Sequence, residues 1–170
     1  MKYLVVSDNH GNRPILVDIQ TTYQGKIDYF FHCGDSELSP QDELWQTFKV
    51  VRGNCDYDPQ YPESLTIETG EDCVFITHGH LVNVGFGLNR LELKAEEAQA
   101  TIALFGHTHQ IGCEMHNQTL FLNPGSVSQP RGKIMIPAYA IIDATDESYE
   151  VQYYRRNHQK IPELHFLFKK

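Results

Sequence analysis

Short apolar runs recur through the first two thirds of the chain, and each one stops at a group of polar residues. The runs are rich in Val, Ile, Phe and Tyr, and they cover residues 3–6, 27–31, 48–51, 73–77 and 101–105. Continuous apolar runs of this length are typical of strands that are buried on both faces, as in the parallel sheets of α/β proteins. The pattern therefore predicts a set of interior strands.

Two longer segments have the spacing of amphipathic helices. In the first, Pro14 suits the first turn of a helix that is capped near Asn12 or Arg13, and Gly25 is a suitable stop. Its apolar positions keep helical spacing at Ile15, Leu16, Ile19 and Tyr23. The second segment, residues 88–100, places its apolar residues on one side, at Leu88, Leu91, Ala95 and Ala98. We therefore expect helices between the strands of the first two thirds.

The last third changes character at about residue 111. Consecutive strands joined by turns are predicted at residues 111–116, 119–122, 133–143, 149–156 and 163–169. Pro137 falls inside the third of these and implies an edge position or a bulge, because proline has no backbone N–H for a sheet. The simplest arrangement of all these elements is one domain over residues 1–170 that contains two sheets.

Composition and charge narrow the class of protein. Hydrophobic residues make up 41% of the chain and the net charge is −8, which suits a globular protein and disfavours long nucleic acid as a partner. A small phosphorylated substrate is still compatible with this charge, because metal ions can supply positive charge locally.

The first apolar run is too short for a signal sequence, and no stretch approaches a membrane span, so a cytoplasmic location is expected. We expect free thiols at Cys33, Cys55, Cys73 and Cys113.

Candidate chemistry lies directly after the predicted strands. Five polar segments follow apolar runs: Asp8-Asn9-His10, Gly34-Asp35, Gly53-Asn54-Cys55-Asp56, Thr77-His78-Gly79-His80 and Gly106-His107-Thr108-His109. The carboxyl ends of strands in open α/β sheets are where ligands bind, so these segments are expected to meet. His32, His116, His158 and His165 fit no such motif and are interpreted as structural or surface residues.

The residue types in these segments suit two divalent metal ions. Aspartate and histidine are ligands for Mn²⁺, Fe²⁺, Co²⁺, Ni²⁺ and Zn²⁺, and a carboxylate such as that of Asp35 can bridge two ions. The candidate ligands are Asp8, His10, Asp35, Asn54, His78, His107 and His109. Taken singly, a strand-end histidine is often a turn residue and Asp35 could be an ordinary turn aspartate. As a set, these residues favour a two-metal phosphoester site.

The five segments, together with Asn123-Pro124-Gly125-Ser126-Val127, resemble the calcineurin-like metallophosphoesterase superfamily and its small YfcE-type branch. The resemblance implies a four-layer αββα sandwich, in which two mixed sheets are flanked by helices. It also implies a partition of the ligands. Asp8, His10, Asp35 and His109 would hold one ion, whereas Asp35, Asn54, His78 and His107 would hold the other. The implied reaction is hydrolysis of a phosphodiester by in-line attack of a metal-bridging hydroxide, most simply with two Mn²⁺ ions.

One position departs from the superfamily pattern. Many members have a histidine after Gly-Asn that assists the leaving group, and Cys55 stands there in this chain, as is usual in the YfcE-type branch. A thiol is a weak hydrogen-bond donor, so another acid such as His80, or a substrate with a good leaving group, is implied. Catalytic roles are accordingly assigned to Asn54, Cys55, Asp56 and His80. Activated phosphodiesters are expected to be better substrates than alkyl monoesters.

The sequence leaves more than one interpretation open for the substrate-binding residues and for the function. Arg13 and Ser126 are candidates for binding substrate, while a surface charge and a structural turn are the respective alternative interpretations. Arg52 and Arg131 lie near motifs and have the same alternative as Arg13. The rival function is a protein-interaction scaffold of the same fold, similar to the retromer subunit; a nuclease or nucleotide hydrolase is a second rival. No membrane partner is expected, and assembly of identical chains is left open.

Overall fold

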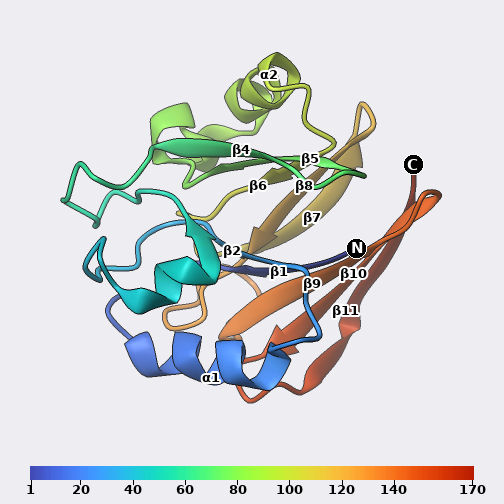
Figure 1. Cartoon of the computed structure of the whole chain (residues 1–170). Helices are drawn as coiled ribbons and strands as arrows, with labels where there is room; N and C mark the ends of the chain where they lie inside the picture. Colours follow the sequence, from blue (N-terminus) through green and yellow to red (C-terminus); the bar gives the residue numbers. More distant parts are fainter.

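The computed structural model describes residues 1–170, and its strands form two mixed sheets that pack face to face (Figure 1). The first sheet has the order β11-β10-β9-β1-β2-β3. Its strands are β1 (Lys2–Val6), β2 (Tyr29–His32), β3 (Phe48–Val50), β9 (Ala138–Ala144), β10 (Ser148–Arg155) and β11 (Lys160–Lys169). Strands β1, β2 and β3 run parallel, and β9, β10 and β11 add antiparallel partners.

The second sheet has the order β4-β5-β6-β8-β7. Its strands are β4 (Ser64–Glu68), β5 (Cys73–Thr77), β6 (Ile102–Leu104), β7 (Ile111–His116) and β8 (Thr119–Pro124). Strands β5, β6 and β8 are parallel, while β4 and β7 are antiparallel edge strands. Each sheet therefore contains three neighbouring parallel strands, which form one half of the first sheet and the centre of the second. Within each set, the carboxyl ends point in one direction.

Alternating side chains of the central strands supply three hydrophobic layers. In β1, Tyr3 and Val5 face the core between the sheets, whereas Leu4 and Val6 pack against α1 (Arg13–Tyr23). In β5, Val74 faces the core between the sheets and Phe75 packs against α2 (Asn89–Glu97). Figure 1 shows α1 and α2 on opposite outer faces, so the predicted four-layer sandwich is confirmed.

Local details differ from the sequence expectation. Strand β4 was not anticipated because it is a half-exposed edge strand, without the continuous apolar run of its buried neighbours. Residues 133–137 are not part of a strand, and Pro137 immediately precedes β9. Since β9 lies between β10 and β1, the predicted edge position is wrong: the proline ends the loop, and its missing N–H costs no sheet hydrogen bond.

The two helices are short. Helix α2 ends at Glu97, whereas the sequence predicted a helix over residues 88–100. Neither α1, with 11 residues, nor α2, with 9, could span a membrane.

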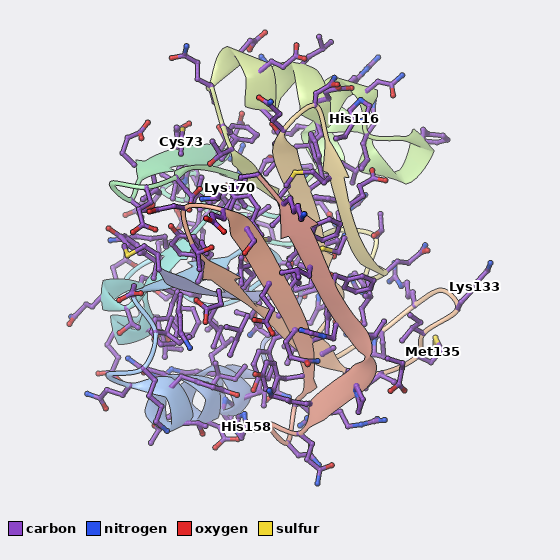
Figure 2. All side chains as sticks on the ribbon, turned by 90° about the vertical axis from the view of Figure 1, so that its right-hand side faces the viewer. Cys73, His116, Lys133, Met135, His158 and Lys170 are labelled. Atoms are coloured by element: carbon purple, nitrogen blue, oxygen red, sulfur yellow. The ribbon has the colours of Figure 1, made fainter.

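A buried aspartate joins the two sheets at the end opposite the candidate ligands. The Asp72 carboxylate, in the turn before β5, accepts hydrogen bonds from Tyr3 Oη (2.9 Å), Tyr149 Oη (2.5 Å) and Thr101 Oγ1 (3.2 Å). It also accepts one from Lys170 Nζ (3.0 Å), and Figure 2 shows Lys170 at the end of β11 beside this part of the second sheet. Burial opposes the charge on Asp72, but the donors outweigh it and lower the pKa below its ordinary value.

Candidate metal centre

The loops that carry the candidate ligands are tied together by backbone hydrogen bonds. Asp8 N–H donates to the Gly34 carbonyl and His10 N–H to the Asp35 carbonyl, both at 3.1 Å. In the second sheet, Gly106 N–H donates to the His78 carbonyl at 3.0 Å. The loops after β1 and β2 are thereby paired, as are those after β5 and β6, at the same end of the sandwich. These backbone hydrogen bonds bring the polar segments together, as the sequence analysis expects.

Five of the candidate ligands have a left-handed backbone. The φ angles are 56° at Asp8, 45° at His10, 53° at Asp35, 68° at His107 and 57° at His109. This region costs of order 1–3 kcal/mol for a residue with a side chain, and strained residues of this kind cluster at functional sites. The left-handed backbone turns the chain away from the strand direction at each of these positions.

One group of ligands gathers around Asp8. The ligand atoms of Asp8, His10, Asp35 and His109 all lie within 4.8 Å of one another. His109 Nε2 is 3.1 Å from Asp8 Oδ1 and 3.2 Å from His10 Nε2. His10 Nε2 is 4.0 Å from Asp8 Oδ1 and 4.0 Å from Asp35 Oδ2. This is the set of residues that the resemblance assigns to the first ion.

The second group gathers around Asn54. Its side-chain oxygen Oδ1 is 3.1 Å from His78 Nε2 and 2.8 Å from His107 Nδ1. His78 Nε2 in turn is 3.4 Å from Asp35 Oδ2. Asp35 therefore contacts both groups, through His10 on one side and His78 on the other, and its carboxylate is the link that a bridging ligand must provide.

Hydrogen bonds behind the rings orient the nitrogen atoms. His78 Nδ1 is 2.7 Å from the Cys33 carbonyl, and His109 Nδ1 is 2.7 Å from the Gln129 carbonyl. A carbonyl only accepts, so both Nδ1 atoms carry the proton, and in a neutral ring the lone pair of Nε2 faces the cluster. This is the arrangement of metal-binding histidines.

The Asp8 carboxylate has an oxygen atom that a bound cation would stabilise. Asp8 is fully buried; its Oδ2 accepts from Ser7 Oγ at 2.6 Å, whereas its Oδ1 has no hydrogen-bond partner. A buried carboxylate oxygen without a donor is costly, and a metal ion removes that cost. Burial alone would lower the pKa of His78, but Asp35 and Asp8 outweigh it and raise that pKa. The donor set therefore fits a divalent metal.

Glycine at position 53 lets the Asn54 loop approach Asp35 closely. A Cβ atom on Gly53 would lie 2.0 Å from Asp35 Oδ1 and 2.2 Å from the Asp35 backbone nitrogen. The Cys55 N–H donates to the same Oδ1 at 2.7 Å. Only a residue without a side chain fits here, and the closeness of the two loops fixes the Asp35 carboxylate.

Two of the sequence-predicted residues support the loops and do not face the cluster. The Asp56 carboxylate accepts from Glu37 N–H (2.7 Å), Gly53 N–H (2.8 Å) and Ser36 Oγ (3.0 Å), and it is buried. Ser126 Oγ is also buried; it donates to the Asp8 carbonyl at 2.7 Å and accepts from backbone N–H groups. These contacts favour a structural role for both residues, which for Ser126 is the alternative interpretation given above: Asp56 and Ser126 hold the loops of the candidate ligands in place.

The arginines are engaged outside the cluster. Arg13 donates to Asp42 at 2.8 and 3.1 Å and to Glu43 at 2.9 Å, which raises its pKa and leaves its guanidinium paired with acids. Arg52 pairs with Glu63. These ion pairs fit the alternative interpretation of Arg13 as a surface charge, and its contact with substrate stays a prediction.

Cys55 and His80 lie beside the ligands. Burial, followed by the Asp35 charge, raises the pKa of the Cys55 thiol to about 11, so the thiol holds its proton at neutral pH. The His80 ring centroid is 5.4 Å from that of His78 and 6.1 Å from that of His107, and its Nδ1 is buried without a partner. Burial, then these two neighbours, lowers the pKa of His80.

The structure also places the side chain of Glu37 beside a candidate ligand, His10, and the sequence analysis did not predict this contact. Its Oε1 atom is 2.5 Å from His10 Nδ1. The only sequence signal is its place two residues after Asp35. His32, by contrast, is structural as predicted: it is fully buried, and its Nε2 lies 2.8 Å from Asn9 Oδ1. Burial lowers its pKa to about 4, which keeps the ring neutral.

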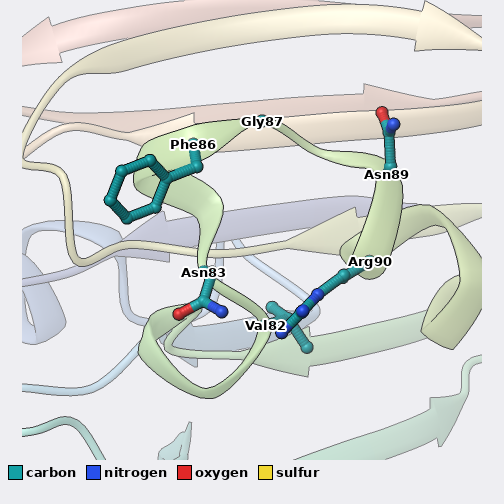
Figure 3. Close-up of a pocket in the computed structure, with 6 residues that line it drawn as sticks. All are labelled: Val82, Asn83, Phe86, Gly87, Asn89 and Arg90. Carbon is teal, nitrogen blue, oxygen red and sulfur yellow. The ribbon is translucent and has the colours of Figure 1, made fainter.

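A surface pocket of 330 Å³ is lined by residues that follow His80 in the chain, and none of the candidate ligands lines it. Its lining consists of Val82, Asn83, Phe86, Gly87, Asn89 and Arg90, from the short 3₁₀ turns His80–Val82 and Val84–Phe86 and the start of α2. In Figure 3 the Phe86 ring points away from Val82 and Arg90. The pocket is therefore separate from the metal-ligand cluster.

The comparisons with known proteins agree with this site. A model of the calcineurin-like phosphoesterase superfamily domain matches residues 1–147, so the chain belongs to this superfamily, as its motifs predicted. It is similar to the probable metallophosphoesterase YsnB of Bacillus subtilis (strain 168): the two are 33% identical over 164 residues, which cover 96% of each chain. The class defined by fold and site is thus the metallophosphoesterases.

Solved structures share the fold of this chain. A conserved protein of Streptococcus pneumoniae TIGR4, described as a predicted phosphoesterase, has 40% identity and a TM-score of 0.97 over 99% of this chain and 97% of that chain. Two more distant structures share the fold. The phosphoesterase YfcE of E. coli has 22% identity and a TM-score of 0.67, over 95% and 97% of the chains. Zinc-complexed Vps29 of Entamoeba histolytica has 20% identity and a TM-score of 0.73, over 100% and 98%.

Proposed function

We propose that the chain is a dinuclear metal-dependent phosphoesterase that hydrolyses phosphodiester bonds. The observation that carries this proposal is the position of the Asp35 carboxylate, which contacts His10 of one ligand group and His78 of the other. The two groups together contain two carboxylates, so two divalent ions would leave the centre with a net charge of about +2. We infer that Mn²⁺ is the ion, with Ni²⁺, Fe²⁺, Co²⁺ and Zn²⁺ as alternatives that the same ligands accept.

The residues of the chain supply position and charge for this reaction. When bound, two metal ions would polarise a phosphate oxygen and lower the pKa of water at the centre. Asp35 fixes the spacing of the two ligand groups, and the carbonyl partners of His78 and His109 hold their rings in the productive tautomer. His80, half-buried beside His78, is the candidate to assist the leaving group.

Substrate preference follows from the lack of a strong acid at position 55. A well-placed general acid contributes about 10²–10⁴-fold when the leaving group is basic, and the protonated Cys55 thiol is a poor substitute. With Mn²⁺ bound, we expect bis-p-nitrophenyl phosphate to be hydrolysed at least about 10²-fold faster than an alkyl phosphate monoester. Initial rates measured with these two substrates and with p-nitrophenyl phosphate test this. Chelator-treated protein is the control, and faster turnover of p-nitrophenyl phosphate than of its bis ester would contradict the preference.

The second candidate function is a protein-interaction scaffold with little or no activity. The observation that favours it is the shared fold with Vps29, at a TM-score of 0.73. All the ligand positions are filled in this chain, which supports the enzyme. Negligible hydrolysis with every one of the five metals, in a protein that is folded, would favour the scaffold. We further propose a small phosphorylated substrate, because the net charge of −8 disfavours a long nucleic acid. A cytoplasmic location is part of the same proposal.

A further inference from the structure

The Glu37 carboxylate lies behind one of the ligand histidines. Glu37 Oε1 is 2.5 Å from His10 Nδ1, while His10 Nε2 is on the cluster side, 3.2 Å from His109 Nε2. The two nitrogens of the ring therefore face different partners. A carboxylate can only accept from a neutral or charged imidazole, so the proton belongs on Nδ1 and the lone pair of Nε2 is left for a metal.

Glu37 is held in place by the loop that Asp56 organises. Its backbone N–H donates to Asp56 Oδ1 at 2.7 Å, and the Ser36 hydroxyl donates to the same oxygen at 3.0 Å. Glu37 has a left-handed backbone with φ of 54°, a conformation that costs energy for a residue with a side chain. The pinned and strained backbone directs the carboxylate to His10, so the contact follows from the loop structure.

His10 differs from the other oriented histidines in the kind of partner that it has. His78 and His109 each donate from Nδ1 to a backbone carbonyl, and both rings are buried. The His10 side chain is 11% exposed, and its partner is a charged side chain. A carboxylate behind a ligand histidine fixes the ring orientation and makes the nitrogen on the other side a stronger ligand.

We propose that Glu37 is the positioning residue for His10 and thereby sets the affinity of the ion held by Asp8, His10, Asp35 and His109. This inference rests on the proposed dinuclear site. It predicts an asymmetric effect, because the Glu37 side chain pairs with His10 and has no hydrogen bond or ion pair with Asn54, His78 or His107, which would help to hold the other ion. Partners of this kind typically change metal affinity by about 10–100-fold when they are removed.

The test compares Glu37→Gln and Glu37→Ala with the parent and with Glu150→Gln. Glu150 pairs with His165 Nε2 at 2.7 Å on the β10–β11 surface, so its variant removes a similar contact away from the cluster. Calorimetric titration with Mn²⁺ should show one of two binding steps weakened by about 10–100-fold in Glu37→Ala, less in Glu37→Gln, and unchanged in Glu150→Gln. Nitrogen NMR of the metal-free chain should show the His10 proton on Nδ1 in the parent and a mixture of tautomers in Glu37→Ala.

The outcomes separate this proposal from the proposed function. Two unchanged binding steps in Glu37→Ala, or equal weakening of both, would overturn the positioning role of Glu37. A third Mn²⁺ that binds the parent and is lost in Glu37→Ala, with the two original steps unchanged, would also overturn it, because Glu37 would then be a ligand beside Cys55. A parent that binds no Mn²⁺ would refute the dinuclear site, and the tautomer of His10 would still report on Glu37.

Discussion

Replacing Asp35 with Asn is expected to lower Mn²⁺-dependent hydrolysis of bis-p-nitrophenyl phosphate by at least about 10³-fold, because loss of one electrostatic contact in a catalytic site already costs about 10²–10³. The Asp35 side chain lies 4.0 Å from His10 Nε2 and 3.4 Å from His78 Nε2. An amide has one acceptor oxygen and no charge, so it cannot bridge two cations as a carboxylate can. The rate per chain, measured after reconstitution with Mn²⁺, reports the loss.

Two variants make this experiment specific. His107→Ala removes a ligand of one group only and should also abolish the activity. Asp143→Asn is the matched control: Asp143 pairs with Lys2 at 3.1 Å at the start of β1, the opposite end of that strand from Asp8. Its activity should equal that of the parent. Retention of more than about a tenth of the parent rate by a folded, metal-loaded Asp35→Asn protein would argue against a bridging carboxylate.

Replacing Asp72 with Ala is expected to lower the free energy of unfolding by about 3 kcal/mol at pH 7. The substitution leaves the hydroxyls of Tyr3 and Tyr149 without their buried acceptor and leaves Lys170 without its ion-pair partner. Tyr3 and Tyr149 belong to the first sheet, and Asp72 lies in the turn that leads into β5 of the second sheet. The loss therefore loosens the packing between the two sheets. Urea unfolding at pH 7 measures the effect, and Glu71→Ala, at an exposed neighbour, is the control.

The same network predicts a pH dependence. The pKa of Asp72 is lower in the folded chain than its ordinary value near 3.9, so its charge stabilises the fold above that value. This stabilisation is lost as the pH falls through the folded pKa. The difference in unfolding free energy between parent and Asp72→Ala should therefore be constant above about pH 5 and shrink below about pH 4. A difference that grows towards low pH would contradict the role of the Asp72 charge.

The sequence predicted the buried frame of the molecule because that frame has a local signal. Strands packed on both faces need continuous apolar runs, and such runs marked β1 and β5. Candidate ligands placed directly after strands, such as Asp8 and His78, could be proposed for the same reason. The half-exposed strand β4 has a weaker pattern and was missed.

The supporting residues of the site could not be predicted in this way. Glu37 contacts His10 because the Asp35 loop adopts a left-handed backbone and because Asp56, from another loop, accepts the Glu37 N–H. These contacts join residues 19 and 27 positions apart, and no periodicity or spacing rule connects them. The role of Ser126 depends similarly on the Asp8 carbonyl, 118 residues away.

The central claim is that Asp35 joins two divalent ions in one site. The most direct measurement is an anomalous-diffraction map of crystals of the parent protein grown with Mn²⁺. The map is predicted to show two peaks, and each should mark an Mn²⁺ ion that is coordinated by a carboxylate oxygen of Asp35. His109 should lie beside one ion and His107 beside the other. A single peak, or two peaks of which only one contacts Asp35, in crystals saturated with Mn²⁺ would contradict the dinuclear site.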